Sequence, residues 1–124
     1  MGSADDVRAA FEEWAVAVRE ADADRSLAGR SEEVVLFDVA PPARVTGAAA
    51  YRADWELFWA AQGRGLFDVS EMTVVAGKEV AFAYGPTVVG AAGTEGFAVR
   101  LTVGLRRDGD RWLVLHEHHS IPPE

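Results

Sequence analysis

Hydrophobic residues recur at helical spacing in two stretches of the first half of the chain. In the first stretch they are Val7, Phe11, Trp14 and Val18. In the second stretch they are Tyr51, Trp55, Phe58 and Trp59. Because spacings of three and four residues place side chains on one face of a helix, this pattern predicts helices over residues 3–23 and 48–62.

Polar and small residues mark the ends of these two helices. Ser3 followed by Asp6 resembles a capping box at the first helix start, and Thr46 is a candidate cap for the second. Gly63 is expected to end the second helix. A short helical turn over residues 24–28 is expected between them.

Runs of strand length make up the rest of the sequence. Residues 33–39 form a short hydrophobic run that stops at a pair of prolines, which a central strand could not continue. Four β-rich runs follow the second long helix, at residues 66–76, 79–89, 95–107 and 111–120. The Asp-Gly pair between the last two runs predicts a hairpin.

This order of elements predicts an α+β fold in a single domain over residues 1–124. We expect a curved antiparallel sheet wrapped around two long helices and a short helix, as a cone-shaped α+β barrel. A cone of this kind leaves a space between sheet and helices, where a small ligand would bind.

Composition and charge narrow the range of partners. Hydrophobic residues at 49% and charged residues at 26% are typical of a globular protein. A net charge of −8 would repel a phosphate backbone, so we expect no nucleic-acid partner. The sequence has no cysteine, which excludes disulfides and thiolate chemistry.

The sequence shows neither a hydrophobic membrane span nor the features of a signal peptide. No hydrophobic run reaches the length of a membrane span, and the first residues, MGSADDVRAA, are acidic. We therefore expect no membrane partner and a cytoplasmic location. The basic residues are almost all arginine and alanine is abundant, which is typical of a bacterial gene of high GC content.

Two long segments resemble a known family. They are VVLFDVAPPARVTGAAAYRADWE in the middle of the chain and LTVGLRRDGDRWLVLHEHHSIP at its end. With these segments and its order of elements, the chain resembles the SnoaL-like proteins of the nuclear transport factor 2-like, or ketosteroid-isomerase-like, superfamily. The resemblance implies the cone-shaped fold and a homodimer. Because this superfamily includes isomerases, cyclases, hydrolases, dehydratases and proteins without known catalysis, the resemblance implies no single reaction.

Asp38 is the first candidate catalytic residue. It follows a hydrophobic strand, where desolvation would raise the pKa of its carboxyl and make it a usable proton acceptor. The resemblance to ketosteroid isomerases implies the same role for it. Trp14 or Arg100 would then have to stabilise a developing oxyanion, because the isomerases' own donors have no counterpart here. Alternatively, Asp38 only hydrogen-bonds the amides of its loop.

The final strand carries the densest polar cluster, His116-Glu117-His118-His119. Because strand side chains alternate, His116 and His118 share one face while Glu117 and His119 share the other. The residues alone leave open which pair faces the helices. Resemblance to the association domain of calcium/calmodulin-dependent kinase II implies that Glu117 and His119 point inward, as a catalytic acid–base pair.

Other roles for this cluster remain open. The histidines could instead pair across the sheet or lie in a dimer interface, and His118 remains a candidate pocket residue. His116 and His118 could ligate one metal ion together with Asp38. We nevertheless expect no metal and no cofactor, because no further ligand cluster is present.

Aromatic residues supply candidate pocket walls. Trp55, Trp59 and Tyr84 are expected to line the cavity, although aromatic residues at such spacing more often belong to the core. We expect a small hydrophobic or aromatic ligand.

Two functions follow from these residues. The first is a cofactor-independent enzyme that transfers protons in an apolar pocket, and the alternative is a non-catalytic ligand-binding or assembly domain. A two-fold homodimer through the open sheet face is expected in either case, with Val99, Leu101 and Val103 or their alternates on that face.

Overall fold

One sheet and three helices account for the part of the chain that the computed structural model describes, residues 2–63 and 65–122. The helices are α1 (Ser3–Arg19), α2 (Ala23–Leu27) and α3 (Ala48–Gln62). The strands are β1 (Arg30–Phe37), β2 (Val45–Thr46), β3 (Gly65–Asp68), β4 (Thr73–Ala76), β5 (Val80–Ala91), β6 (Phe97–Asp108) and β7 (Arg111–Ser120). The predicted α+β class is confirmed.

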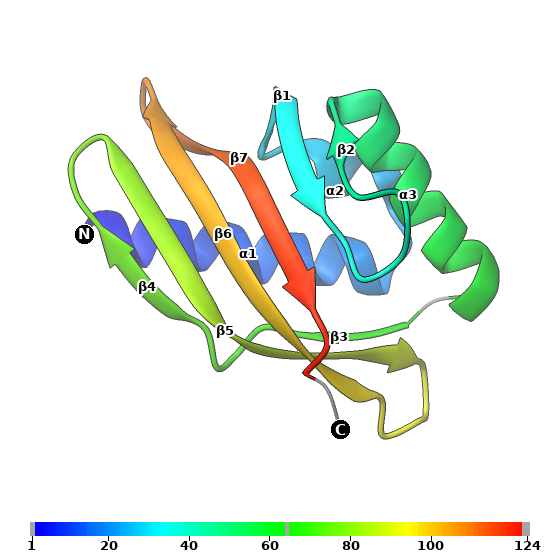
Figure 1. Ribbon diagram of the computed structural model, residues 1–124. Coiled ribbons are helices and arrows are strands. Elements are labelled where there is room, and N and C mark those ends of the chain that lie inside the picture. Colours follow the sequence, from blue (N-terminus) through cyan, green and yellow to red (C-terminus); the bar gives the residue numbers. More distant parts are fainter. Residues whose placement is uncertain (1, 64, 123–124) are drawn as a thin grey trace.

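The sheet is mixed rather than purely antiparallel. Its order is β2-β1-β7-β6-β5-β3, with β4 also paired to β5, and β1 runs parallel to β7 (Figure 1). This parallel pair joins strands from opposite ends of the chain, so no hairpin signal marks it in the sequence. The single run expected over residues 66–76 is two strands, β3 and β4, which pair with different parts of β5.

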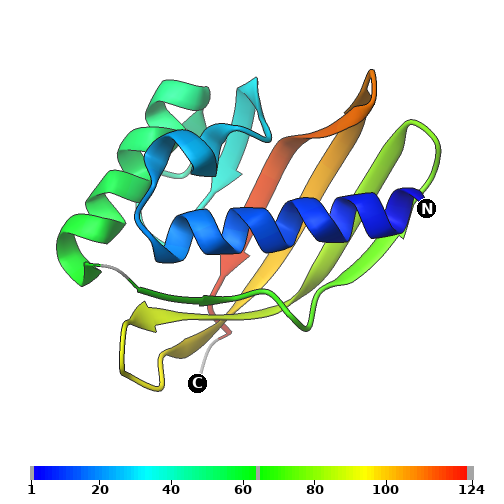
Figure 2. The same ribbon diagram turned by 180° about the vertical axis from the view of Figure 1, so that it is seen from behind.

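The long helix α1 lies across one face of the sheet, and α3 covers the end near β1 (Figures 1 and 2). The hydrophobic stripe of α1 is buried in the core, as its spacing predicts. Opposite it, Val99, Leu101 and Val103 of β6 point into the same core, so these three residues do not lie on the open sheet face. In the described residues, no helix is long and apolar enough to cross a membrane.

Glycines, not the expected polar caps, begin the long helices. Gly2 precedes α1 and Gly47 precedes α3, and neither start has a side-chain cap. Ser3 instead accepts a hydrogen bond from Arg107 Nη2 at 3.1 Å, and Thr46 belongs to β2. Gly47 has φ of 92° and donates its N–H to the Val34 carbonyl at 2.7 Å. Only glycine adopts this backbone geometry readily, and it sets the direction in which α3 leaves β1 and β2.

A β-bulge in β7 changes which of its side chains face the helices. Gly104 of β6 pairs with His116, but the next residue, Leu105, pairs with Val114, so one residue of β7 is left over between them. Glu117 and His119 are buried on one side of this bulge, while Trp112 and Val114 face α1 on the other side. Strict alternation along β7 would put Leu113 and Leu115 on the inner face with Glu117 and His119, but the bulge reverses the alternation at this point.

Candidate functional site

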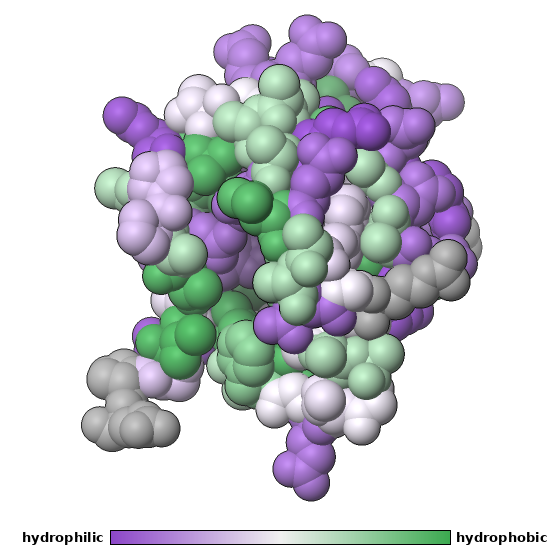
Figure 3. Space-filling view, turned by 90° about the vertical axis from the view of Figure 1, so that its right-hand side faces the viewer, coloured by the Kyte–Doolittle hydropathy of each residue, from purple (hydrophilic) through white to green (hydrophobic). Residues whose placement is uncertain are grey.

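A cavity of about 310 Å³ opens between α3, the inner face of the sheet and the loop that follows β1. Hydrophobic side chains surround a hollow on this side of the molecule (Figure 3). The aromatic part of the wall comes from Trp55, Phe58 and Phe97, and the polar part from Asp38, Asp54, Gln62 and His119. This volume is at the small end of the range for ligand sites.

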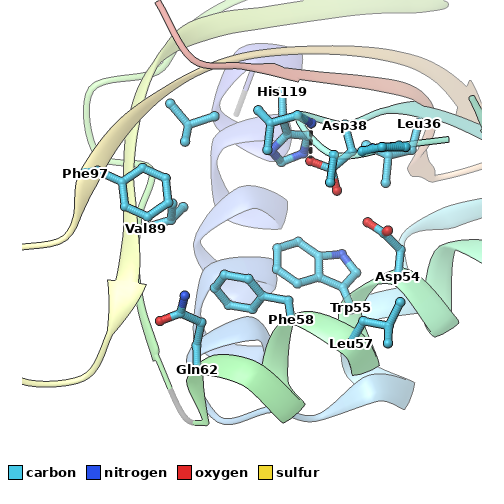
Figure 4. A pocket seen from close by; sticks show the side chains of 14 residues that line it. Leu36, Asp38, Asp54, Trp55, Leu57, Phe58, Gln62, Val89, Phe97 and His119 are labelled. Carbon is cyan, nitrogen blue, oxygen red and sulfur yellow. Dashed lines mark hydrogen bonds between the residues drawn. The ribbon is translucent and has the colours of Figure 1, made fainter. Parts of the chain in front are cut away.

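His119 is the buried basic group of this cavity. It extends from β7 into the space above the Trp55 ring (Figure 4), with ring centroids 6.4 Å apart, and only 8% of its surface is exposed. Its Nε2 lies 3.0 Å from Glu117 Oε1. An ionised carboxylate only accepts hydrogen bonds, so Nε2 carries the proton in the neutral ring. Nδ1 then keeps a free lone pair, which is the form a general base needs.

Glu117 is fully buried and is held as an anion by three neighbours. Arg30 Nε donates to its Oε2 at 2.9 Å, and Tyr51 donates its hydroxyl to the same oxygen at 2.7 Å. Arg30 Nη2 also lies 2.8 Å from Oε2. Burial alone would raise the pKa of Glu117, but Arg30 and the hydrogen bonds from His119 and Tyr51 outweigh it and lower the pKa well below the ordinary value.

Tyr51 stays protonated in this network. Burial, followed by the nearby Glu117 carboxylate, raises the pKa of the Tyr51 hydroxyl far above its ordinary value. The hydroxyl therefore always donates to Glu117, and Arg30 packs its guanidinium 4.0 Å from the centroid of the Trp14 ring. Charge, donors and stacking together fix the orientation of Glu117, and Glu117 in turn fixes His119.

Besides His119, the cavity wall carries a pair of carboxyl side chains. Asp38, at the end of β1, and Asp54, on α3, point to the same side of it (Figure 4). Burial raises the pKa of Asp54 to about 7, helped by hydrogen bonding with and repulsion from Asp38. Asp38 Oδ1 also accepts the Val39 N–H at 2.8 Å, so both roles expected for this residue are compatible with its position.

The predicted site residues lie in three kinds of position: at the cavity, in the core, or on the outer face of the sheet. Asp38, Trp55 and His119 line the cavity, and Glu117 lies directly behind His119. Trp14 is buried in the core instead, beside a separate cavity of about 90 Å³. Trp59 does not line the main cavity, because its indole N–H donates to the Val18 carbonyl at 3.0 Å and ties α3 to α1.

The prediction that Tyr84, Arg100 and His118 line the cavity is wrong. All three side chains are exposed on the outer face of the sheet, and none lines the cavity. The reason is alternation along the strands: their neighbours Ala83, Leu101 and His119 take the inward positions. Arg100 donates to Ser120 Oγ at 3.1 Å, and His118 packs edge-on against Phe37. No oxyanion role remains for Arg100 in this arrangement.

Three residues beside the cavity were not recognised in the sequence as part of the candidate site. Arg30 and Tyr51 hold Glu117, and Asp54 completes the carboxyl pair. Asp54 does carry a signal, because it is three residues after Tyr51 and four before Phe58, on the edge of the buried helix stripe. Arg30 carries none, since its partners come from distant parts of the chain.

Metal coordination has no geometric support in the residues that the structure describes. They contain no group of three or more His, Asp or Glu side chains placed to hold one ion. His116 and His118 do not form a set with Asp38, because His116 Nδ1 lies 2.7 Å from the Val35 carbonyl and His118 is on the outer face.

Comparisons with known proteins bear on the fold and the family. The SnoaL-like domain family matches residues 7–124, which confirms the resemblance drawn from the sequence. No curated protein sequence matches the chain.

Solved structures show the same architecture. An NTF2-like protein of unknown function from Pseudomonas putida KT2440 is 31% identical, with a TM-score of 0.90, over 98% of this chain and 88% of its own. A candidate dehydratase of the NTF2-like family from Streptomyces avermitilis is 17% identical, with a TM-score of 0.80, over 98% and 96%. A candidate calcium/calmodulin-dependent protein kinase type II association domain from Thiobacillus denitrificans is 21% identical, with a TM-score of 0.78, over 94% of each chain. The last two likenesses show the fold alone.

Proposed function

The chain belongs to the SnoaL-like domain family, and from this premise and the geometry of its cavity we propose that it is a cofactor-independent enzyme that transfers protons on a small apolar molecule. One observation carries the proposal. His119, on the wall of an apolar cavity, is held by the buried anion Glu117 so that an unprotonated ring nitrogen is available. A buried ion pair that orients a histidine is more than a core needs for packing alone.

Two proton-transfer groups face the same space in this proposal. His119 removes a proton from carbon, and Glu117 stabilises the imidazolium that forms. The Asp38–Asp54 pair exchanges a proton with a heteroatom of the substrate, since the raised pKa of Asp54 keeps a proton available near neutral pH. Isomerisation, cyclisation and dehydration all need one group that takes a proton and one that gives a proton.

The comparisons supply modest support for catalysis. The Streptomyces protein is a candidate dehydratase. Dehydration requires this combination of a base and an acid. At 17% identity it does not fix the reaction of this chain.

Hydrogen–deuterium exchange tests the proposal without knowledge of the full reaction. A panel of small aryl ketones with acidic α-protons is incubated in heavy water and followed by proton NMR. We expect the protein to catalyse exchange, and His119→Gln and Asp38→Asn to lower the rate by about 10²–10⁴-fold. His118→Gln, a histidine on the outer face, is the matched control and should keep the full rate.

Two results would count against catalysis. An unchanged rate in His119→Gln would remove this residue from the mechanism. Ligands that bind in the cavity without catalysed exchange would favour the alternative, a non-catalytic binding domain of the same fold.

We also propose that the protein is a homodimer through the outer face of the sheet. Val75, Val80, Phe82 and Tyr84 are each 47–66% exposed there, on the neighbouring strands β4 and β5. A contiguous group of large exposed hydrophobic side chains is typical of an interaction surface. A second copy of the chain is the expected partner, and its two-fold contact would bury the same patch on both copies.

A further inference from the structure

Trp55 presents a closely packed indole ring to the main cavity. Its side chain lines the cavity from α3, and only 8% of the residue is exposed. Six rings have their centroids 5.4–6.5 Å from the Trp55 ring, and they belong to Trp14, Tyr51, Phe58, Trp59, Phe67 and His119. Because such packing leaves the ring little room to rotate, the fold sets the direction of its N–H.

The indole N–H of Trp55 has no hydrogen-bond partner among the residues that the structure describes. Tyr51, one turn earlier on α3, does not provide one, because its hydroxyl donates to Glu117 and accepts from Arg30 Nε at 3.1 Å. The indole is near enough to oppose part of the rise in the Tyr51 pKa, which burial causes, but the two groups form no hydrogen bond. Buried polar groups without a partner are rare and call for an explanation such as a ligand.

The unpartnered N–H faces the polar side of the cavity. Figure 4 shows the nitrogen edge of the Trp55 ring turned toward Asp38 and Asp54, and neither carboxyl accepts from it. Burial and hydrogen bonding with Asp38 raise the pKa of Asp54 to about 7, so the two carboxyl groups share a proton near neutral pH. A protonated carboxyl donates a hydrogen bond. This side of the cavity therefore offers an N–H and an O–H, and an acceptor oxygen is the group that complements them.

An uncharged oxygen suits these donors better than a carboxylate or phosphate. No lysine or arginine lines the cavity within the described chain, and the guanidinium of Arg30 is bound to Glu117 behind the wall. The negative charge that remains on the Asp38–Asp54 pair would repel an anion. A carbonyl oxygen has two lone pairs and no proton of its own, so it can accept from both donors.

A carbonyl group also suits the proposed base. When a proton moves from the neighbouring carbon to Nδ1 of His119, the electron pair of the C–H bond forms a C=C bond. The π pair of the carbonyl then moves onto its oxygen. A fixed N–H donor at that oxygen stabilises the developing negative charge. The aromatic wall of Trp55, Phe58 and Phe97 and the volume of about 310 Å³ suit a compact apolar body beside the carbonyl.

We propose that the indole N–H of Trp55 binds the oxygen of an uncharged ketone or aldehyde and so determines the substrate class of the cavity. This inference rests on the proposed function in taking the cavity as the substrate site. It adds the residue that recognises the substrate and the functional group that this residue recognises.

Proton–nitrogen NMR of the indole groups tests this inference on the full, isotope-labelled chain. The probes are acetophenone and ethylbenzene, which has the same carbon skeleton but no oxygen. The Trp55 signal is assigned by its absence in Trp55→Phe. We expect the Trp55 indole proton to move downfield with acetophenone, as it does when a hydrogen bond forms, and not with ethylbenzene. The hydrocarbon controls for the effect of a nearby ring on the signal.

The affinities of the two probes give a second measurement. Trp55→Phe keeps an aromatic ring but removes the donor, so the affinity for acetophenone should fall about three- to tenfold while that for ethylbenzene is unchanged. Trp112→Phe is the matched control. The Trp112 N–H is also buried without a partner in the described structure, but Trp112 lines the smaller cavity, so both affinities should stay the same.

The outcomes separate this inference from the proposed function. The inference is overturned if acetophenone does not bind, if it leaves the Trp55 signal in place, or if Trp55→Phe weakens both probes equally. Acetophenone binding that depends on Trp55, without catalysed hydrogen exchange in the wild-type protein, would contradict only the proposed catalysis. Catalysed exchange with full acetophenone affinity in Trp55→Phe would contradict only the inference.

Discussion

At the residue scale, the cavity depends on a buried charge that the rest of the molecule must keep ionised. Glu117 is 0% exposed and would be costly to bury alone. Arg30 and Tyr51 both bind its Oε2, which leaves Oε1 for His119. The arrangement therefore divides the carboxylate into a structural oxygen and an oxygen that orients the histidine.

Removing the positive partner should expose the cost of this burial. In Arg30→Met, Glu117 keeps its burial but loses its cation, and we expect the free energy of unfolding to fall by about 3–5 kcal/mol in urea denaturation at neutral pH. Arg52→Met is the control, because Arg52 forms only exposed ion pairs and its loss should change the free energy of unfolding much less than the loss of Arg30. Equal losses in both variants would contradict the account of Glu117.

Asp54 should show the opposite pH dependence from an ordinary surface carboxyl. Its folded-state pKa of about 7 lies above the ordinary value of 3.8, so ionisation at Asp54 lowers stability between these values and the loss is complete above pH 7. Asp54→Asn should therefore be more stable than the wild type by about 1–2 kcal/mol at alkaline pH, after discounting for solvent screening. Below the ordinary pKa the two proteins should be equal.

Urea denaturation across this pH range measures the difference. If the variant were equally stabilised at every pH, titration of Asp54 would not be the cause. If it were less stable at alkaline pH, the carboxylate would be making a favourable contact that the structure does not contain.

At the scale of elements, the sequence predicted what depends on local spacing. The α3 bounds at residues 48–62 and the buried stripe of α1 both follow from spacings of three and four. Strand positions after α3 were also close, because turn residues separate the runs. The polar caps expected at the helix starts were wrong, since the N–H of Gly47 donates to the Val34 carbonyl of β1 and no side chain caps α3.

The candidate site was predictable only in part, because local spacing does not show which residues from separate elements meet. Asp38 and His119 stand out as polar residues at the ends of hydrophobic strands, and both line the cavity. Tyr84 and Arg100 were misplaced because the sequence shows alternation but not which face is the inner one. The spacing of Asp54 from Tyr51 and Phe58 puts it at the edge of the buried helix stripe, but only the fold places it beside Asp38.

Attachment of α3 to α1 gives a prediction at this scale. The Trp59 N–H donates to the carbonyl of Val18, next to the end of α1, at 3.0 Å. Trp59→Phe keeps an aromatic ring but removes this donor, so the free energy of unfolding should fall by about 1 kcal/mol or somewhat more. Leu57→Ala, on a residue that is 72% exposed, should change it by less than about 0.5 kcal/mol. Similar values for the two variants would show that the hydrogen bond adds little to helix attachment.

At the scale of the whole molecule, the two faces of the sheet carry different kinds of side chains. The inner face supplies the core and the cavity, and the outer face carries Phe82 and Tyr84, whose rings stack with centroids 6.1 Å apart. His116 and His118 are on β7, with Phe37 of β1 against both rings. The proposed ligand site and the proposed dimer contact therefore lie on opposite faces of the sheet.

Assembly can be measured by light scattering at micromolar concentration. We expect a mass about twice the 13.4 kDa of one chain, and a return to one chain when a charge is placed in the patch by Phe82→Arg. Ala60→Arg adds the same charge on an exposed position of α3 and should leave the dimer intact. A wild-type mass of a single chain would exclude the homodimer.

The central claim is that Glu117 holds His119 with the proton on Nε2 and a free lone pair on Nδ1, and nitrogen NMR of the imidazole rings tests it most directly. His116 is an internal reference, because its Nδ1 lies 2.7 Å from the Val35 carbonyl and must carry the proton there. In the neutral form of the two rings we expect opposite tautomers. His119 should show a protonated Nε2 and a bare Nδ1, and His116 the reverse. A His119 ring protonated on Nδ1, or a mixture of both tautomers, would contradict the claim that this nitrogen is the base of the cavity.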